Sequence, residues 1–466
     1  MKKILSFLAA GAIALAASAQ ETITPEVLST LKQSYEGNAA DRARQSVVSN
    51  GSFRKLAMRP EVNTTGENTY FSVDIRNTGI TDQQSSGRCW MFTGMNVLRN
   101  KAMKKMGITG FQFSQIHLFF YDQLEKANLF LQGIIDTRSE SIDHQKVQWL
   151  MQNPLSDGGT YTGVADLVSK YGLVPAEVQE ETWASNNTSE IDGHLKRKLR
   201  EIAINLRELA QAGKGEAELQ AYKVEQMKTI YQMLVLAYGE PVQEFLWAPR
   251  GKDGKLLSEL KKYTPLEFYH EYCAEAGDLQ KDYVMLMNDP SRPYNKVYEI
   301  DMDRHTHDGH NWLYLNLDIK DLAPIAIASL KDSTQMYFSC DVGKFLDSKK
   351  GVLDIQAWDY NSLLGTTFGM NKKQRIQTRD SGSSHAMTLM AVDLDEQGNP
   401  IKWKVENSWG ASSGHNGYLI MTNEWFNEYM FRVVVNKKYM PKKLMKLMEQ
   451  KPILLPAWDP MFMEEK

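Results

Sequence analysis

The apolar residues of this 466-residue chain change from a helical spacing in the first half to a strand spacing in the last third. Residues 402–406 alternate polar and apolar, as a half-buried strand does. By contrast, an earlier set of apolar residues repeats at 4-3-4-3 intervals, which places them on one helix face: Leu195, Leu199, Ile202, Leu206 and Leu209. Because helices come first and strands follow, the sequence predicts an α+β fold with its functional site at their junction.

Further patterns place the other elements. Helices are expected at 25–35, 89–106, 113–131 and 227–237, the last forming a hairpin with the 4-3-4-3 helix. Further strands are expected at 387–392, 418–421 and 433–435. A chain of this length can bury a large core and form about two or three subdomains.

The first 19 residues have the pattern of a signal peptide. Lys2 and Lys3 precede an apolar run from Ile4 to Ala16, and Ala17-Ser18-Ala19 is a small-residue cleavage site. No later run reaches the roughly 20 apolar residues that span a membrane. We therefore expect an exported, periplasmic or extracellular protein without membrane insertion; a short N-terminal anchor is the alternative.

The charge of the chain gives no reason to expect nucleic acid as a partner. The formal net charge is −3, and charged residues make up 24% of the sequence. The basic cluster at residues 437–446 is interpreted as a solvated helix face.

Three cysteines cannot all pair with one another. Cys273 lies in a helix-like run and Cys340 ends a strand-like run. Both are interpreted as buried small apolar residues, with a Cys273–Cys340 disulfide as the alternative.

Cys89 differs because it follows Gly87 at the start of a predicted helix. The unpaired N–H groups at a helix start stabilise a thiolate, which is the nucleophilic form of cysteine. His385 can act as the base for this thiol, and Asn407 can orient the histidine ring. Gln83 can donate to the oxyanion together with the N–H of Cys89.

Each of these residues has a structural interpretation when taken alone. A cysteine before a helix, a histidine in a strand and an asparagine in a turn are all common in proteins without catalytic activity. Trp409 can cover the hydrogen bond between His385 and Asn407. The glycines Gly158 and Gly159 either form a plain turn or offer backbone groups to an extended peptide substrate.

The block Gln83-Gln84-Ser85-Ser86-Gly87-Arg88-Cys89-Trp90 resembles the active-site block of the bleomycin hydrolase and aminopeptidase C family, a branch of the papain-like cysteine peptidases. Segments at 113–131, 153–159, 405–410 and 455–461 resemble the same family, and the resemblance extends from about residue 25 to the C-terminus. It implies that Cys89 is the nucleophile, His385 the base, Asn407 the orienting residue and Gln83 the oxyanion donor.

The resemblance also implies the architecture. It predicts a papain-like two-lobed fold, with a helical lobe and a β-barrel-like lobe, a large helical insertion and a C-terminal arm that enters the cleft. The terminal carboxylate of Lys466 would hold the free amine of a peptide substrate, and the chains would form hexamers. We accordingly divide the chain into a signal peptide (1–19), an N-terminal arm (20–75), a helical catalytic lobe (76–188), a helical insertion (189–330), a β-rich lobe (331–445) and the C-terminal arm (446–466).

We expect a cysteine aminopeptidase that needs no cofactor or metal and acts on peptides through a thioester. An endopeptidase or dipeptide-releasing peptidase is the alternative if the arm is short of the site, and a non-catalytic hexameric scaffold is the alternative of another class. The run from Asp303 to His310 has no family counterpart, and His305, His307 and His310 could bind a transition metal. A solvated loop is the favoured interpretation of that run.

Overall fold

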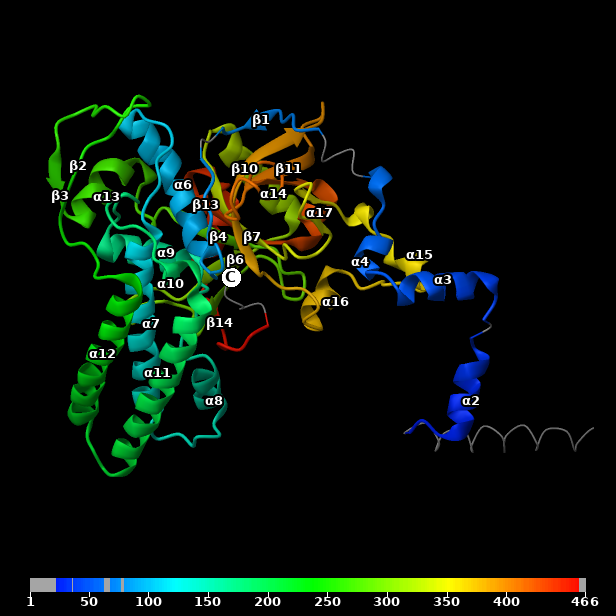
Figure 1. Cartoon of the computed structure of the whole chain (residues 1–466), viewed down its shortest axis with the longest axis horizontal. Coiled ribbons are helices and arrows are strands. Elements are labelled where there is room, and N and C mark those ends of the chain that lie inside the picture. Colours follow the sequence, from blue (N-terminus) through cyan, green and yellow to red (C-terminus); the bar gives the residue numbers. More distant parts are fainter. Residues whose placement is uncertain (1–21, 36, 63–67, 77–78, 461–466) are drawn as a thin grey trace, which may run out of the picture. The chain divides into compact units, whose positions relative to one another are not determined.

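The structure, a computed structural model, describes residues 22–35, 37–62, 68–76 and 79–460 (Figure 1). These residues divide into two units. One comprises the described residues up to Pro60 together with Gln356–Phe368, and the other comprises Glu61–Ile355 and the described residues from Gly369 onward. The predicted signal peptide and Lys466 lie outside the described residues.

The smaller unit is built from short helices: α2 (Pro25–Gln33), α3 (Ala39–Ser49), α4 (Phe53–Leu56) and α15 (Tyr360–Leu364). All of these except α4 have a side-chain cap at the N-terminus. Asn38 begins α3 by accepting the N–H of Asp41 at 2.9 Å. The two chain segments meet in a backbone bridge, in which the Asp359 N–H donates to the Ala57 carbonyl at 2.8 Å.

A mixed sheet forms the centre of the larger unit. Its strands lie in the order β14 (Ile453–Leu455), β5 (Lys296–Ile300), β6 (Leu313–Asn316), β4 (Tyr283–Met287), β13 (Met430–Asn436), β7 (Met336–Cys340), β10 (His385–Leu394), β11 (Pro400–Glu406), β12 (Tyr418–Thr422), β9 (Val352–Leu353) and β8 (Leu346–Asp347). The short strand β1 (Val73–Asp74) pairs with the second half of β10, and β7 pairs with its first half. In the pairing of β7 with β10, His385 lies opposite Cys340.

Helices cover this sheet and form a separate helical core: α6 (Cys89–Met106), α7 (Gln115–Asp136), α8 (Gln145–Gln152), α9 (Tyr161–Tyr171), α10 (Trp183–Asn186), α11 (Thr188–Gln211), α12 (Glu216–Tyr238), α13 (Pro265–Cys273), α14 (Ile319–Lys331), α16 (Lys372–Gln377), α17 (Asn423–Tyr429) and α18 (Lys442–Met445). A small hairpin of β2 (Phe245–Trp247) and β3 (Lys261–Tyr263) lies beside α13. The expected α+β fold is confirmed.

The helix α6 joins the two cores because it packs both on the other helices and on β10. It ends at Gly107, whose φ of +69° is a left-handed conformation that glycine adopts without strain. One core lies among the helices and includes Trp90 and Leu199, whereas the other lies on the sheet and includes Trp403 and Trp425. Any residue at the start of α6 therefore lies where helices and sheet meet.

The long hairpin of α11 and α12 packs against α7 (Figure 1). Four of the five residues in the 4-3-4-3 stripe are fully buried, which explains the spacing: Leu195, Leu199, Ile202 and Leu206. The helical character predicted for residues 189–330 holds for this hairpin. It is wrong for residues 283–316, where β4, β5 and β6 belong to the central sheet. The predicted domain boundaries otherwise stay a prediction.

Among the described residues, no helix combines the length and the apolar character that crossing a membrane requires.

Candidate active site

Cys89 is the first residue of α6 and is fully buried. The loop before it closes tightly because Gly87 has no side chain: a Cβ there would lie 2.5 Å from an Asp157 carboxylate oxygen. The Gly87 N–H donates to Asp157 Oδ2 at 2.7 Å. Cys89 thus lies where the positive end of an 18-residue helix stabilises a thiolate.

His385 begins β10, the strand that packs against α6. The N–H of the next residue, Ala386, donates to Cys89 Sγ at 3.4 Å, so the Cys89 thiol lies against the start of the strand that carries His385. His385 Nε2 lies 2.8 Å from Asn407 Oδ1. Because the asparagine oxygen accepts the Nε2 proton, Nδ1 is the ring nitrogen able to take the thiol proton.

Asn407 follows β11 and is 2% exposed. Its Oδ1 also accepts the Ser408 N–H at 2.8 Å, which fixes the side-chain amide with its oxygen towards His385. The ring of Trp409 lies 4.8 Å from the His385 ring, in the covering position expected from the sequence. Just before Asn407, Glu406 forms a buried ion pair with Arg99 of α6.

Gln83 is 4% exposed and lies in the loop before α6. Its Oε1 accepts the Ser408 hydroxyl at 2.7 Å, and its Nε2 donates to the Ser86 carbonyl at 2.5 Å. An amide nitrogen carries two hydrogens, so the second can serve an oxyanion. The structure therefore brings Gln83, Cys89, His385 and Asn407 to one junction of α6 with the sheet; their catalytic roles stay predictions.

Gly158 and Gly159 are buried beside the residue that follows the nucleophile. A Cβ at Gly159 would lie 2.6 Å from the Trp90 ring, and Trp90 Nε1 donates to the Asp157 carbonyl at 2.9 Å. The loop is thus packed onto the start of α6. Its contact with a substrate stays a prediction.

The C-terminal arm approaches the loop at residues 381–384, just before His385, which we call the histidine loop. Strand β14 pairs with β5, and Asp459 then accepts two hydrogen bonds from Arg292 Nη2, at 2.7 and 2.6 Å. Farther on, the Pro460 carbonyl lies 3.8 Å from the position of a Cβ on Gly382, three residues before His385. The described part of the arm therefore ends beside the loop that carries the histidine.

A cavity of about 420 Å³ lies at this place. Ser384 precedes His385 and lines the cavity together with Ser156 and Ala457 of the arm. Its apolar lining includes Leu129, Phe130, Leu150 and Leu155, and its charged lining includes Lys126, Lys196, Asp301, Asp303 and Arg304. This cavity is lined by none of the four predicted catalytic residues, so it adjoins their junction without containing it.

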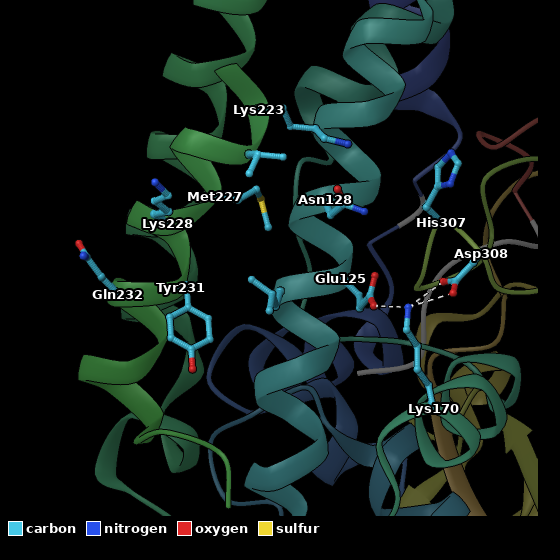
Figure 2. A pocket seen from close by; sticks show the side chains of 12 residues that line it. Glu125, Asn128, Lys170, Lys223, Met227, Lys228, Tyr231, Gln232, His307 and Asp308 are labelled. Carbon is cyan, nitrogen blue, oxygen red and sulfur yellow. Dashed lines mark hydrogen bonds and ion pairs between the residues drawn. The ribbon is translucent and has the colours of Figure 1, made fainter. Parts of the chain in front are cut away.

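A larger groove of about 820 Å³ lies between α7 and α12, away from these residues (Figure 2). In it Lys170 bridges Glu125 and Asp308, at 2.7 and 2.9 Å. The groove holds none of the predicted catalytic residues, so the chemistry of the side chains locates the site better than the size of the cavity does.

The three histidines near residue 305 face different partners. His305 is buried and bonds Asp122, His310 Nδ1 lies 2.8 Å from Asp166 Oδ1, and His307 is exposed on the larger groove. Within the ranges that the structure describes, no three His, Cys, Asp or Glu side chains are grouped to hold a metal ion. The favoured solvated-loop interpretation is wrong for His305, which packs against Trp90.

All three cysteines of the chain are buried, and none forms a disulfide, so the Cys273–Cys340 alternative is wrong. Burial raises the pKa of the Cys273 thiol to about 12. Cys273 therefore remains a neutral, unreactive thiol near neutral pH.

The geometry agrees with a family comparison: a model of the peptidase C1-like family matches residues 22–462. This chain belongs to the peptidase C1-like family. It is 40% identical over 390 residues to bleomycin hydrolase from Homo sapiens, covering 82% of this chain and 85% of that protein. It is 36% identical over 432 residues to aminopeptidase C from Streptococcus thermophilus, covering 92% of this chain and 95% of that protein.

A solved structure resembles this peptidase C1-like chain over almost its whole length. PepW from Lactobacillus rhamnosis HN001 matches with a TM-score of 0.90 at 33% identity, covering 95% of this chain and 99% of that one. The expected papain-like fold is confirmed, and the chain is a cysteine peptidase.

Sequence reasoning missed the residues that hold the site in place. Ser408 orients Gln83 and was signalled only by its position beside Asn407. Asp157 binds both the Gly87 N–H and the Thr188 hydroxyl, and only its position before two glycines marked it. Nothing in the sequence marked Lys126 and Arg292, because a lysine or arginine that is buried in the fold cannot be distinguished from an exposed one by sequence alone.

Proposed function

We propose that this peptidase is an aminopeptidase, which removes N-terminal residues from peptides through a thioester. The observation that carries the proposal is the approach of the C-terminal arm to the histidine loop, with Pro460 beside Gly382. An arm at this position occupies space that an endopeptidase would leave open for residues before the cleaved bond. The relatives named aminopeptidase C support the same activity.

The chemical steps follow from the residues at the start of α6. The Cys89 thiolate attacks the carbonyl carbon of the first peptide bond, and the oxyanion accepts hydrogen bonds from the Cys89 N–H and Gln83. His385 Nδ1 then protonates the leaving amine, and the C–N bond breaks to give a thioester. Water, deprotonated by His385, attacks the thioester and releases the amino acid, which restores the thiol.

The arm supplies the specificity in this proposal. The carboxylate of Lys466, or of a residue exposed by trimming, would bind the substrate ammonium group. A charge-assisted hydrogen bond of this kind contributes about 1.5–3 kcal/mol, enough to select free over blocked N-termini.

The test compares one peptide with a free amine and the same peptide after N-acetylation. The full-length protein should release single residues from the free peptide and leave the acetylated peptide intact. Deletion of residues 461–466 should permit cleavage of the acetylated peptide while Cys89 keeps its alkylation rate. Internal cleavage of the acetylated peptide by the full-length protein would favour the endopeptidase alternative. A folded protein that cleaves neither peptide would favour the scaffold alternative.

We also propose that the protein is exported and acts in the periplasm or outside the cell as a homohexamer. The pattern of Lys2 and Lys3, the apolar run and Ala17-Ser18-Ala19 supports export. The resemblance to hexameric family members supports the assembly. A mature N-terminus at Gln20 and a hexamer mass by light scattering are the expected results, whereas an intact Met1 in the cytoplasmic fraction would contradict export.

A further inference from the structure

The run from Asp303 to His310 has no role in the proposed reaction, yet one of its histidines reaches the active-site helix. His305 is 2% exposed and lies in the connection between β5 and β6. Its Nδ1 lies 2.6 Å from Asp122 Oδ1 on α7. Its ring meets the Trp90 ring edge-on, with 4.7 Å between the centroids. A loop remote in sequence therefore packs directly behind the residue that follows Cys89.

The carboxylate that holds His305 also holds a buried lysine. Asp122 is fully buried, and its Oδ2 lies 2.9 Å from Lys126 Nζ one turn along α7. Burial opposes the ionisation of Asp122, but Lys126 and His305 outweigh it and keep the pKa of this carboxyl below its usual value. We call Asp122, Lys126 and His305 the buried triad. Because both oxygens of the buried Asp122 carboxylate have partners, the triad can persist in the helical core.

The buried triad contacts one side of the loop at residues 156–159, which we call the glycine loop. Lys126 Nζ donates to the Ser156 carbonyl at 3.0 Å and also to the Gly158 carbonyl. The peptide between Gly158 and Gly159 is trans, so the Gly159 N–H points away from Lys126. Lys126 therefore sets the direction of a backbone donor that an extended peptide can use.

His305 fills the space that two glycines leave. A Cβ at Gly159 or at Gly163 would lie 2.3 Å from His305 Cε1. Gly159 is thus enclosed between His305 on one side and Trp90 on the other. The position of the Gly159 backbone relative to the start of α6 depends on this packing.

We propose that the buried triad positions the Gly158–Gly159 backbone for binding an extended peptide, and so sets substrate affinity rather than the reactivity of Cys89. This role rests on the proposed peptidase function. Lys126, Asp122 and His305 are positioning residues, because they act through the glycine loop and touch no reacting atom. The Cys89 thiolate depends instead on the helix start and on His385.

The first experiment measures Lys126→Met in the full-length protein with an unblocked peptide of four residues. KM should rise about 10- to 100-fold, because a charged donor to the loop is lost, while kcat changes less than about threefold. Alkylation of Cys89 by iodoacetamide should keep its wild-type rate. Lys126→Arg, which keeps a charged donor, should recover part of the affinity.

Lys223→Met is the matched control. Lys223 is also buried, on α12, and its Nζ donates to Gln132 Oε1 at 2.8 Å, but it lines the larger groove (Figure 2). Its substitution should leave KM unchanged. Should Lys126→Met misfold because Asp122 keeps its charge, the double variant Asp122→Asn/Lys126→Met removes both charges and carries the same expectation.

The outcomes separate the two proposals. An unchanged KM in a folded Lys126 variant, or slower alkylation of Cys89 there, would overturn the positioning role. A wild-type protein that cleaves no peptide contradicts the proposed function instead. The positioning role is then still testable as peptide affinity in Cys89→Ala, where Lys126→Met should weaken binding by the same factor and equal affinity would overturn it.

Discussion

At the scale of single residues, two buried thiols differ because of what surrounds them. Cys89 lies at the start of α6, where backbone N–H groups and the adjoining strand that begins with His385 favour the thiolate. Cys273 lies near the end of α13 in the helical core, and burial raises its pKa to about 12. The same side chain is therefore predicted to be a nucleophile at one position and is an apolar core residue at the other.

Cys89→Ala should abolish peptide hydrolysis, by about 10⁴-fold or more, and keep the fold, because no neighbouring group can replace the thiolate. Iodoacetamide at pH 7.5 should label Cys89 and not Cys273, since a thiol with a pKa of about 12 is ionised in only about one molecule in 3 × 10⁴ at that pH. Peptide mapping by mass spectrometry measures both sites. Retained turnover in Cys89→Ala would rule out this nucleophile.

Gln83→Ala should lower kcat about 10²- to 10³-fold with little change in KM, because an oxyanion donor acts mainly in the transition state. Ser408→Ala should cause a smaller loss of kcat, since it frees the Gln83 amide without removing it. Gln112→Ala, at an exposed glutamine, is the control. A rise in KM with unchanged kcat in Gln83→Ala would contradict the oxyanion role.

Asn407→Ala should lower turnover and leave a measurable residual rate. In the proposed mechanism Asn407 orients the ring of His385 through one hydrogen bond of 2.8 Å and takes no part in bond making. Steady-state kinetics compares it with Cys89→Ala. Equal losses in the two variants would mean that Asn407 does more than orient the ring.

At the scale of elements, the site exists because α6 packs on β10 and the arm is fixed beside them. Strand β14 adds to the outer strand β5, and the Arg292–Asp459 pair follows it. Arg292 is 17% and Asp459 9% exposed, so the ion pair is partly shielded from solvent. The arm is thus held at two successive points before its terminal residues.

Arg292→Ala should loosen the arm and weaken selection for free N-termini. We expect KM for an unblocked peptide to rise about tenfold, and slow cleavage of the acetylated peptide to begin. Lys296→Ala, at an exposed lysine of β5, should change neither. The exchanged pair Arg292→Asp with Asp459→Arg should recover part of the selectivity, and an unaltered product ladder in folded Arg292→Ala would show that the pair does not set it.

At the scale of the larger unit, buried charges cross the boundaries between elements. Arg99 of α6 pairs with Glu406 of β11, and removing one partner of such a pair typically costs about 3–5 kcal/mol. Lys372 of α16 is enclosed by oxygen acceptors, with Asn288 Oδ1 at 2.7 Å and the Asn427 carbonyl at 3.1 Å. These contacts tie α16, the helix before the histidine loop, to the end of β4 and to α17.

Lys372 should make stability depend on pH above neutrality. Burial lowers its pKa to about 7, whereas a lysine in an unfolded chain keeps a pKa of about 10.4. Between these values the unfolded chain binds more protons, so the free energy of unfolding should rise with pH by up to about 1.4 kcal/mol per pH unit. Lys372→Met should remove this contribution, and chemical denaturation at pH 7 and pH 9.5 measures it.

The exposed neighbour provides the control for this prediction. Lys373→Met should keep the wild-type pH dependence, because Lys373 lies at the surface. Identical pH dependence in the Lys372 variant and the wild type would show that Lys372 does not lose its proton in this window.

The sequence by itself determined the elements and the reactive residue types. Spacing, caps and turn residues act within a few positions, which is why the helix at Cys89 and the strand at His385 could be placed before the structure was known. It also singled out Gln83, Cys89, His385 and Asn407, because few other settings explain that combination. The helix α11, with its four buried stripe residues, shows the same local determination.

Only the tertiary structure decided which distant segments meet. The sheet includes β4, β5 and β6, which come from a range predicted to be helical. A short apolar run becomes a strand only when a partner strand pairs with it, and the sequence does not show that pairing. His305 was predicted to be in solvent, and its burial depends on Asp122, 183 positions away, and on glycines that make room for it. Long-range packing of this kind produces no periodic pattern in a sequence. The contacts of the buried triad with the glycine loop, and of Arg292 with the arm, were therefore found only in the folded chain.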